Sequence, residues 1–139
     1  MTSEASLYPQ VCRFLERRRW RVAVEVPPRK GSPRRYDVVG VKPRKREAVI
    51  VEVKLHDFRR ALLQTEDRLF VGDYVYVAFP TPYAQVVLES HLDELDETGI
   101  GLLGLDGGVK ELLPPLRSIY VNPERRSSLF EIVLGRGRR

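Results

Sequence analysis

Apolar residues alternate with polar ones, or run without interruption, in four stretches of the chain, and both patterns predict β-strands. These stretches cover residues 21–28, 35–43, 47–55 and 73–80, and a shorter one follows at 99–106. The segment 47–55 (EAVIVEVKL) has the strongest strand pattern of the chain. We therefore expect a sheet in which this segment is a central, buried strand.

Helices are predicted before, between and after these strands. Apolar residues recur at helical spacing over 6–18, 56–73 and 82–97, and Asp57 is a suitable N-cap for the second of these helices. Residues 114–139 are expected to form a partly helical C-terminal extension whose last few residues are disordered.

The order of these elements predicts an α/β fold with a single domain over residues 1–139. Short turns join the first three strands, which predicts an antiparallel meander. The helix over 56–73 then allows the fourth strand to lie beside the third in parallel. The expected architecture is helix, three-stranded meander, helix and strand, with a mixed central sheet that helices flank.

Two charged residues interrupt the most apolar part of the chain. Glu52 and Lys54 stand two positions apart in the stretch AVIVEVKLHD, residues 48–57. Side chains alternate across a strand, so both charges project from the same face. A carboxylate in such a place is costly unless a cation shares its site. One interpretation is therefore structural, namely that Glu52 and Lys54 form a buried ion pair.

Asp37, on the preceding strand, favours a second interpretation. Antiparallel pairing of the two strands would bring Asp37 close to Glu52 across the sheet. Two adjacent carboxylates repel each other unless a proton or a cation lies between them, and oxygen ligands suit Mg²⁺ or Mn²⁺. Lys54 could then activate a water molecule or neutralise charge that develops on a phosphate. This pattern predicts a metal-dependent site for phosphodiester hydrolysis.

Positive charge is concentrated in the first half of the chain. Residues 1–70 contain 17 Lys or Arg and 9 Asp or Glu, a net charge of +8, whereas residues 71–139 contain 7 and 10, a net charge of −3. Such a surface suits a polyanion, and nucleic acid, most simply DNA, is the expected partner. A solvated basic surface is the alternative. The candidate phosphate-binding residues lie in two basic loops and on the helix after the third strand, and they are Arg29, Lys30, Arg34, Arg35, Arg44, Lys45 and Arg60.

The composition makes several other classes of protein poor matches. The single Cys12 cannot form an intrachain disulfide or a cysteine metal site. No apolar run approaches the ~20 residues that a membrane-spanning helix requires. The N-terminal sequence also lacks the basic start and apolar core of a signal peptide. We expect a cytoplasmic protein that does not associate with membranes.

Asp37, followed on the next strand by Glu52-Val53-Lys54, resembles the D…(D/E)xK motif of the PD-(D/E)XK nuclease superfamily. The predicted order of elements is similar to the restriction-endonuclease-like core of that superfamily, although Tyr36 stands where the motif has proline. The runs SEASLYPQVCRFLE and VEVKLHDFRRALLQTEDRLFVGDYVYVAFP resemble uncharacterised bacterial and archaeal proteins assigned to the PD-(D/E)XK phosphodiesterases. This resemblance extends over residues 4–106.

The resemblance implies a role for each residue of the motif. Asp37 and Glu52 would bind Mg²⁺ or Mn²⁺, and the Val53 carbonyl could be a third ligand. Lys54 would be the catalytic lysine. The activity implied is hydrolysis of a phosphodiester in nucleic acid, with DNA as the expected substrate, by a protein that could form a homodimer.

Members of the superfamily often add a glutamate from the first helix, and Glu4 is the best match to it. Glu16 is its rival, although RFLERRRW reads more simply as a solvated helix end. Glu25, on the first strand, could face either the site or the solvent.

Gln64 corresponds to a glutamine that many relatives carry near the active site. It is spaced four residues from both Arg60 and Arg68, so the three side chains line one face of the predicted helix. An exposed polar face is the alternative for this set.

Two rival functions remain compatible with the sequence. In one, the fold is kept as a module that binds nucleic acid or a partner with little or no turnover. In the other, the charges at Asp37, Glu52 and Lys54 form a structural network, and the basic surface serves solubility.

Overall fold

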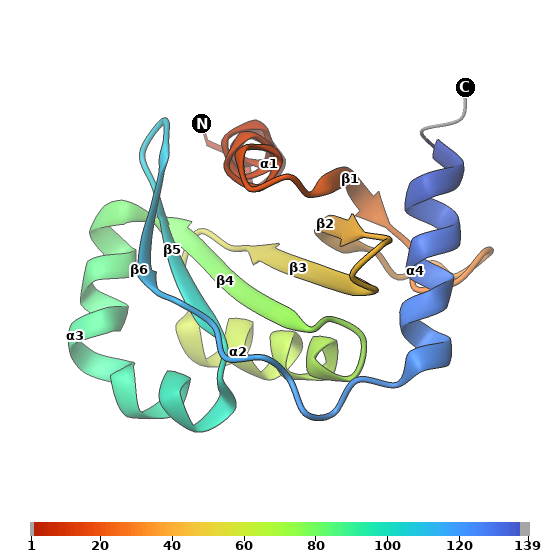
Figure 1. Ribbon diagram of the computed structural model, residues 1–139. Coiled ribbons are helices and arrows are strands. Elements are labelled where there is room, and N and C mark those ends of the chain that lie inside the picture. Colours follow the sequence, from red (N-terminus) through yellow and green to blue (C-terminus); the bar gives the residue numbers. More distant parts are fainter. Residues whose placement is uncertain (1, 137–139) are drawn as a thin grey trace.

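Six strands form one mixed sheet in the order β1-β2-β3-β4-β5-β6 in the computed structural model, which describes residues 2–136 (Figure 1). The strands are β1 (Arg21–Val26), β2 (Tyr36–Lys42), β3 (Glu47–Val53), β4 (Tyr74–Pro80), β5 (Gly101–Leu105) and β6 (Val109–Leu113). Pairing is antiparallel from β1 to β3, parallel from β3 to β5, and antiparallel between β5 and β6. The predicted α/β class, the antiparallel meander and the parallel β3–β4 pair are confirmed.

Helices cover both faces of this sheet (Figure 1). They are α1 (Tyr8–Arg17), α2 (Phe58–Glu66), α3 (Thr81–Thr98) and α4 (Pro123–Arg136), with short 3₁₀ turns at Ala5–Leu7 and Asp67–Phe70. Helix α1 packs on one face, and α2, α3 and α4 pack on the other. Within residues 2–136, no helix combines the length and the hydrophobicity needed to span a membrane.

The central strand β3 is buried along its whole length, because it lies between β2 and β4 and between helices on both faces. Its residues Val49, Val51 and Val53 pack in the core cluster that contains α1. Ala48 and Ile50 pack in the cluster that contains α4. By the alternation of side chains, Glu52 therefore points away from α1, into the layer of α2 and α4.

Three details of the predicted elements are wrong. Strand β6 was not expected, although Gly107-Gly108 before it is a hairpin sequence. The predicted helix over 56–73 ends as α2 at Glu66 and continues as a 3₁₀ turn to Phe70. Residues 135 and 136, which belong to the tail expected to be disordered, lie in α4, and residues 137–139 lie outside the described residues.

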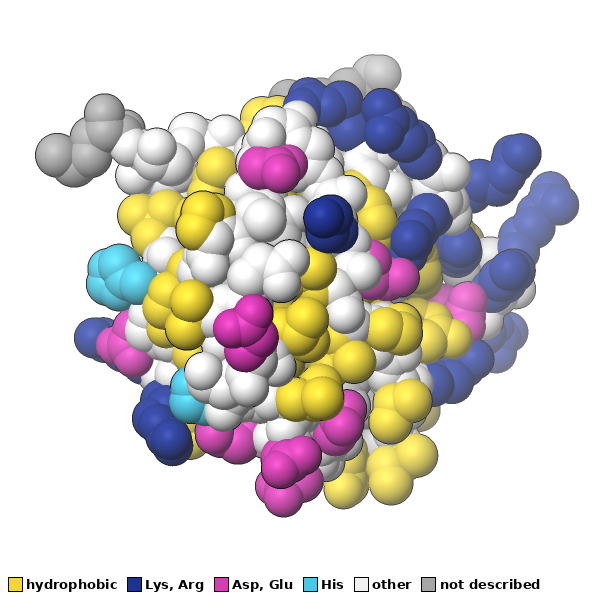
Figure 2. All heavy atoms as spheres, turned by 90° about the vertical axis from the view of Figure 1, so that its left-hand side faces the viewer, with side chains coloured by type: hydrophobic (Ala, Val, Ile, Leu, Met, Phe, Trp, Pro, Cys, Tyr) yellow, Lys and Arg dark blue, Asp and Glu magenta, His cyan; other side chains and the backbone are white. Residues whose placement is uncertain are grey.

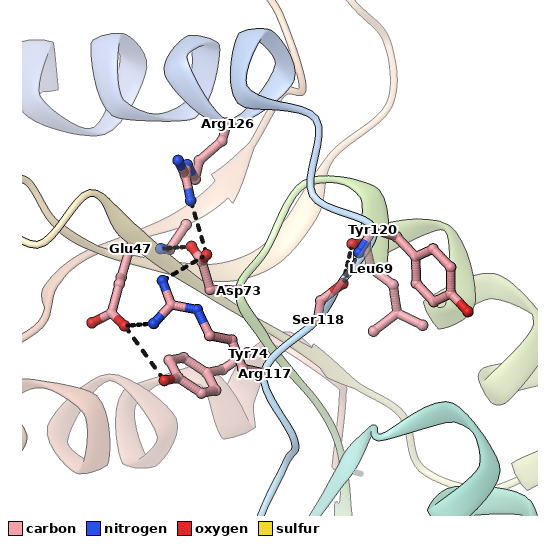
Figure 3. Close-up of polar contacts among 9 residues, drawn as sticks. Glu47, Leu69, Asp73, Tyr74, Arg117, Ser118, Tyr120 and Arg126 are labelled. Atoms are coloured by element: carbon pink, nitrogen blue, oxygen red, sulfur yellow. Dashed lines mark hydrogen bonds and ion pairs between the residues drawn. The ribbon is translucent and has the colours of Figure 1, made fainter.

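The C-terminal segment is tied to the sheet by a buried carboxylate, that of Asp73 (Figure 3). Asp73 accepts hydrogen bonds from the Ala48 N–H and from Arg126 of α4, each at 2.8 Å. Arg117 bridges Asp73, at 3.5 Å, and Glu47, at 2.9 Å. Since these donors come from β3, from the segment before α4 and from α4 itself, Asp73 joins the C-terminal segment to the centre of the sheet.

We predict that Asp73→Ala lowers the free energy of unfolding by about 3–5 kcal/mol, because it leaves Arg126 partly buried without its carboxylate partner. Urea unfolding of the two proteins measures this difference. Asp93→Ala removes an exposed carboxylate from α3 and should change stability by less than about 0.5 kcal/mol. Equal effects of the two substitutions would show that the Asp73 contacts do not hold the C-terminal segment.

Candidate active site at the open end of the β2–β3 pair

The register of β2 and β3 brings two carboxylates face to face. The last backbone pair at this end is Val38 with Val51, so Asp37 and Glu52 are opposed one position further along. The Asp37 N–H donates to Glu52 Oε2 at 2.9 Å, and the Val53 N–H donates to Asp37 Oδ2 at 2.8 Å. Each carboxylate thus accepts a hydrogen bond from a backbone N–H of the neighbouring strand, as a backbone carbonyl does in a regular β-ladder. The two strands stop pairing through their backbones where the carboxylates begin.

Arg68 neutralises Glu52, which is 3% exposed. Its Nη2 lies 3.0 Å from Glu52 Oε1, and its guanidinium carbon lies 4.9 Å from the centre of the Tyr36 ring. The Glu52–Lys54 ion pair considered from the sequence is not formed, since no Lys54 nitrogen lies within 4.0 Å of Glu52. Tyr36 provides the aromatic surface against which the Arg68 guanidinium packs.

Tyr8 is the other side-chain partner of the Asp37–Glu52 pair, and the sequence did not indicate it. Its hydroxyl donates to Asp37 Oδ1 at 2.9 Å. Burial, followed by the nearby Asp37 charge and this hydrogen bond, raises the pKa of Tyr8 well above its usual value. The phenol therefore remains protonated and acts as a fixed donor that holds Asp37 in place.

The Glu52 carboxyl has an unusual protonation equilibrium. Burial and the nearby Asp37 charge raise its pKa from 4.5 to about 7, although Arg68 and Lys54 oppose this shift. A carboxylate pair that retains a proton near neutral pH is a pair that a cation could stabilise in its fully ionised form. The nearby Asp37 charge is the cause of this shift that an isolated Glu52–Arg68 ion pair would lack.

A pocket next to the pair collects other residues expected from the sequence. Lys54, Gln64, Arg60 and Glu4 line a cavity of about 210 Å³, together with His56, Asp57 and Ala61. Asp37 and Glu52 lie outside this lining, although Glu52 is only two residues from Lys54. The structure therefore places these residues in two parts, a carboxylate pair and a pocket lined by the two cations Lys54 and Arg60 and the two carboxylates Glu4 and Asp57.

The donors present suit a hard divalent cation, but they do not enclose one. Asp37 and Glu52 present oxygen atoms of the kind such an ion prefers, and the Asp37 charge is, after burial, a cause of the raised pKa of Glu52. Among residues 2–136, no three His, Cys, Asp or Glu side chains are close enough to share a metal ion. Glu4 therefore does not join Asp37 and Glu52 in one ligand shell, and water or a phosphate would have to complete the coordination of an ion held there.

The two other glutamates considered from the sequence contribute little to the pair. Glu16 is exposed near the end of α1. Glu25 is exposed on β1 with a positive φ of 49°, and its charge is among the causes that raise the pKa of Tyr8.

The two basic loops lie at opposite ends of the β2–β3 pair. The loop 27–35 leads directly into Asp37, and its exposed Arg29 and Arg34 line a groove beside α4. The guanidinium of Arg35 donates instead to the Ser32 and Arg34 carbonyls of its own loop. Lys30 is also exposed in this loop.

Arg44 and Lys45 belong to the turn that joins the far ends of the two strands. Seven residues of extended chain place this turn about 20 Å from Asp37. The two basic loops are therefore separated by the length of the two strands, and only the loop 27–35 lies at the same end as Asp37.

Comparisons with known proteins bear on the fold alone. No family model matches this chain, and no curated protein matches it. Among solved structures, the chain is similar to the SPO1766 protein of unknown function from Silicibacter pomeroyi, with a TM-score of 0.73 and 21% sequence identity. The similarity covers 98% of this chain and 87% of that chain. It establishes a shared α/β fold and leaves the function to be argued from the chemistry of the site.

The raised pKa of Glu52 predicts how stability depends on pH. Between about pH 4.5 and pH 7 the folded protein retains a proton that the unfolded chain has lost, so stability should fall as pH rises through this window. The loss should reach at most about 3 kcal/mol relative to Glu52→Gln, whose amide does not titrate. Urea unfolding of both proteins from pH 4.5 to 8 in EDTA measures it. Parallel stability profiles for the two proteins would exclude a raised pKa at this position.

Proposed function

We propose that this protein is a metal-dependent phosphodiesterase of the PD-(D/E)XK type that cleaves nucleic acid, with DNA as the favoured substrate. The observation that carries the proposal is the Asp37–Glu52 pair, in which the two carboxylates oppose each other beside a pocket that Lys54 lines. The order of α1, the β1–β3 meander, α2 and β4 supports a restriction-endonuclease-like core.

In this proposal the carboxylate pair and the pocket have separate tasks. Asp37 and Glu52, with the Val53 carbonyl, would hold Mg²⁺ or Mn²⁺, which when bound would supply Lewis acidity toward a phosphate oxygen. Lys54 would stabilise negative charge on the phosphate from the pocket side. Arg60 lines the same pocket and would orient the nucleic-acid backbone there.

The remaining contacts of the pair prepare it for this task. Tyr8 fixes Asp37, and Arg68 fixes Glu52 while balancing its charge. Arg68 Nε is buried and has no acceptor among the described residues. A buried N–H without an acceptor is unfavourable, and an ordered water molecule beside the pair would satisfy it.

A module that binds nucleic acid without cleaving it is the second candidate. It is favoured by one observation, namely that all four oxygens of Asp37 and Glu52 already accept a hydrogen bond from the protein. A pair satisfied in this way can persist as a structural element. Metal binding and cleavage distinguish the two candidates.

Titration of Mn²⁺ by calorimetry, first without and then with duplex DNA, tests the metal site. Wild-type protein should bind one ion per chain, and Glu52→Gln should weaken binding by at least about tenfold, because a charged oxygen ligand is lost. Glu89→Gln removes an exposed carboxylate from α3 and should leave the affinity unchanged. If wild-type protein binds no Mn²⁺ even in the presence of DNA, the binding module replaces the nuclease as the favoured function.

Substitution of the lysine tests catalysis. We expect Lys54→Ala to lower the cleavage rate by about 10²–10³-fold, as the loss of one transition-state donor does, with DNA affinity and Tm nearly unchanged. Cleavage of labelled DNA in Mn²⁺ measures the rate, and Lys110→Ala, an exposed lysine on β6, is the matched control. A large fall in the Tm of Lys54→Ala would instead assign Lys54 to the structural network.

A further inference from the structure

A second basic surface lies at the end of the sheet opposite to the Asp37–Glu52 pair. A cleft of about 470 Å³ opens there between the end of α1, the turn after β2 and the segment that follows β6. We refer to it as the far-end cleft, and its lining includes Arg18, Trp20, Lys42, Lys45 and Tyr74. A second hollow adjoins it across Lys42 and Lys45.

The positive charge of this region is mostly unpaired. Six cationic side chains line the two hollows, and they are Arg18, Arg19, Arg21, Lys42, Arg44 and Lys45. Within residues 2–136, only Arg18 of these six forms an ion pair, with Glu111 at 3.1 Å. Figure 2 shows Lys and Arg side chains crowded along the right-hand side of the face that it presents. Such a row of free cations is suited to a chain of phosphates.

The acidic side chains in the far-end cleft are already engaged. Glu111 accepts from Arg18 and from the Tyr76 hydroxyl. Glu47 accepts from Arg117 at 2.9 Å and from the Tyr74 hydroxyl (Figure 3). These two carboxylates therefore do little to repel an anion from the cleft.

An aromatic side chain forms part of the wall. Trp20 follows α1, and its ring lies 6.4 Å from the Tyr74 ring in an edge-on arrangement. Lys42 Nζ lies 4.3 Å from the centre of the indole ring. Gly40 allows this close packing, because a Cβ there would come within 2.9 Å of Trp20 Cβ. Trp20 thus packs against β2, beside Lys42, and lines the cleft.

We propose that the far-end cleft binds single-stranded nucleic acid, with a base stacked on Trp20 in place of the Lys42 ammonium and phosphates held by Lys42, Arg44 and Lys45. Aromatic rings combined with unpaired cations are the features that bind single strands, since an unpaired base offers its π-face. In a duplex both faces of each internal base are already stacked on neighbouring bases, so such a base could not also stack on Trp20. This site is distinct from the Asp37–Glu52 pair and does not depend on catalysis there.

The chain contains one tryptophan, so its tryptophan fluorescence, excited selectively over that of the tyrosines, reports on the far-end cleft. Titration with oligothymidylate in EDTA, which prevents metal-dependent cleavage, should quench the Trp20 emission to a saturable limit. Lys42→Gln/Arg44→Gln/Lys45→Gln should weaken binding at least about tenfold. The slope of log affinity against log salt should also become shallower by about 2, since each phosphate contact to a single strand contributes about 0.7.

Two further double variants separate this site from general electrostatic attraction. Arg44→Gln/Lys45→Gln changes only exposed side chains and should weaken binding by a smaller factor than the triple variant does. This variant controls for misfolding that the Lys42 substitution could cause. Arg59→Gln/Lys110→Gln removes the same charge from exposed positions on α2 and β6 and should leave quenching and affinity unchanged.

Three outcomes would overturn the proposal. They are the absence of quenching at saturating oligonucleotide, an equal loss of affinity in the two double variants, and stronger quenching by a duplex of the same length. The assay contains no free metal, so it does not depend on cleavage. If the protein passes this test but does not cleave DNA, the proposed function is refuted and the far-end cleft proposal stands.

Discussion

The mutual repulsion of Asp37 and Glu52 is the constraint on which the rest of the site depends. Their opposition follows from the β2–β3 register, and it would be unfavourable if the pair had no other partners. The fold surrounds the pair with donors, because backbone N–H groups, the Tyr8 hydroxyl and the Arg68 guanidinium each bind one oxygen. Helix α1, through Tyr8, and the 3₁₀ turn after α2, through Arg68, therefore each contribute one donor to the two carboxylates.

The sequence predicts the parts of this arrangement that follow from strand periodicity. Glu52 and Lys54 two positions apart, and Asp37 on the preceding strand, were sufficient to expect the opposed carboxylates. Tyr8 could not be identified, since its contact with Asp37 spans 29 residues and depends on how α1 packs across the sheet. Arg68 gave a weak indication through its spacing from Gln64, but its inward turn depends on the 3₁₀ segment that follows α2.

Strand β6 was missed for a related reason. Its sequence, VKELL, is short and only partly buried, so its hydrophobic pattern is weak, and it is stabilised by pairing with β5. The positions of the basic loops are a topological consequence that composition cannot reveal. Successive loops of a meander lie at alternate ends of the sheet, so loops close in sequence are separated by the length of a strand.

The protein accommodates the buried Glu52 carboxylate by giving it a fixed cationic partner. Arg68 supplies a positive charge that is part of the protein itself. Its guanidinium, which extends from the 3₁₀ turn, is held between the Glu52 carboxylate and the Tyr36 ring. An arginine stacked on an aromatic ring is more rigid than a lysine on a flexible stem, which suits a permanent partner of Glu52. Lys54, whose nitrogen makes no ion pair with Glu52, is left free to face the pocket. The division of charge between a fixed arginine and a free lysine is the property that a purely structural ion pair would not require.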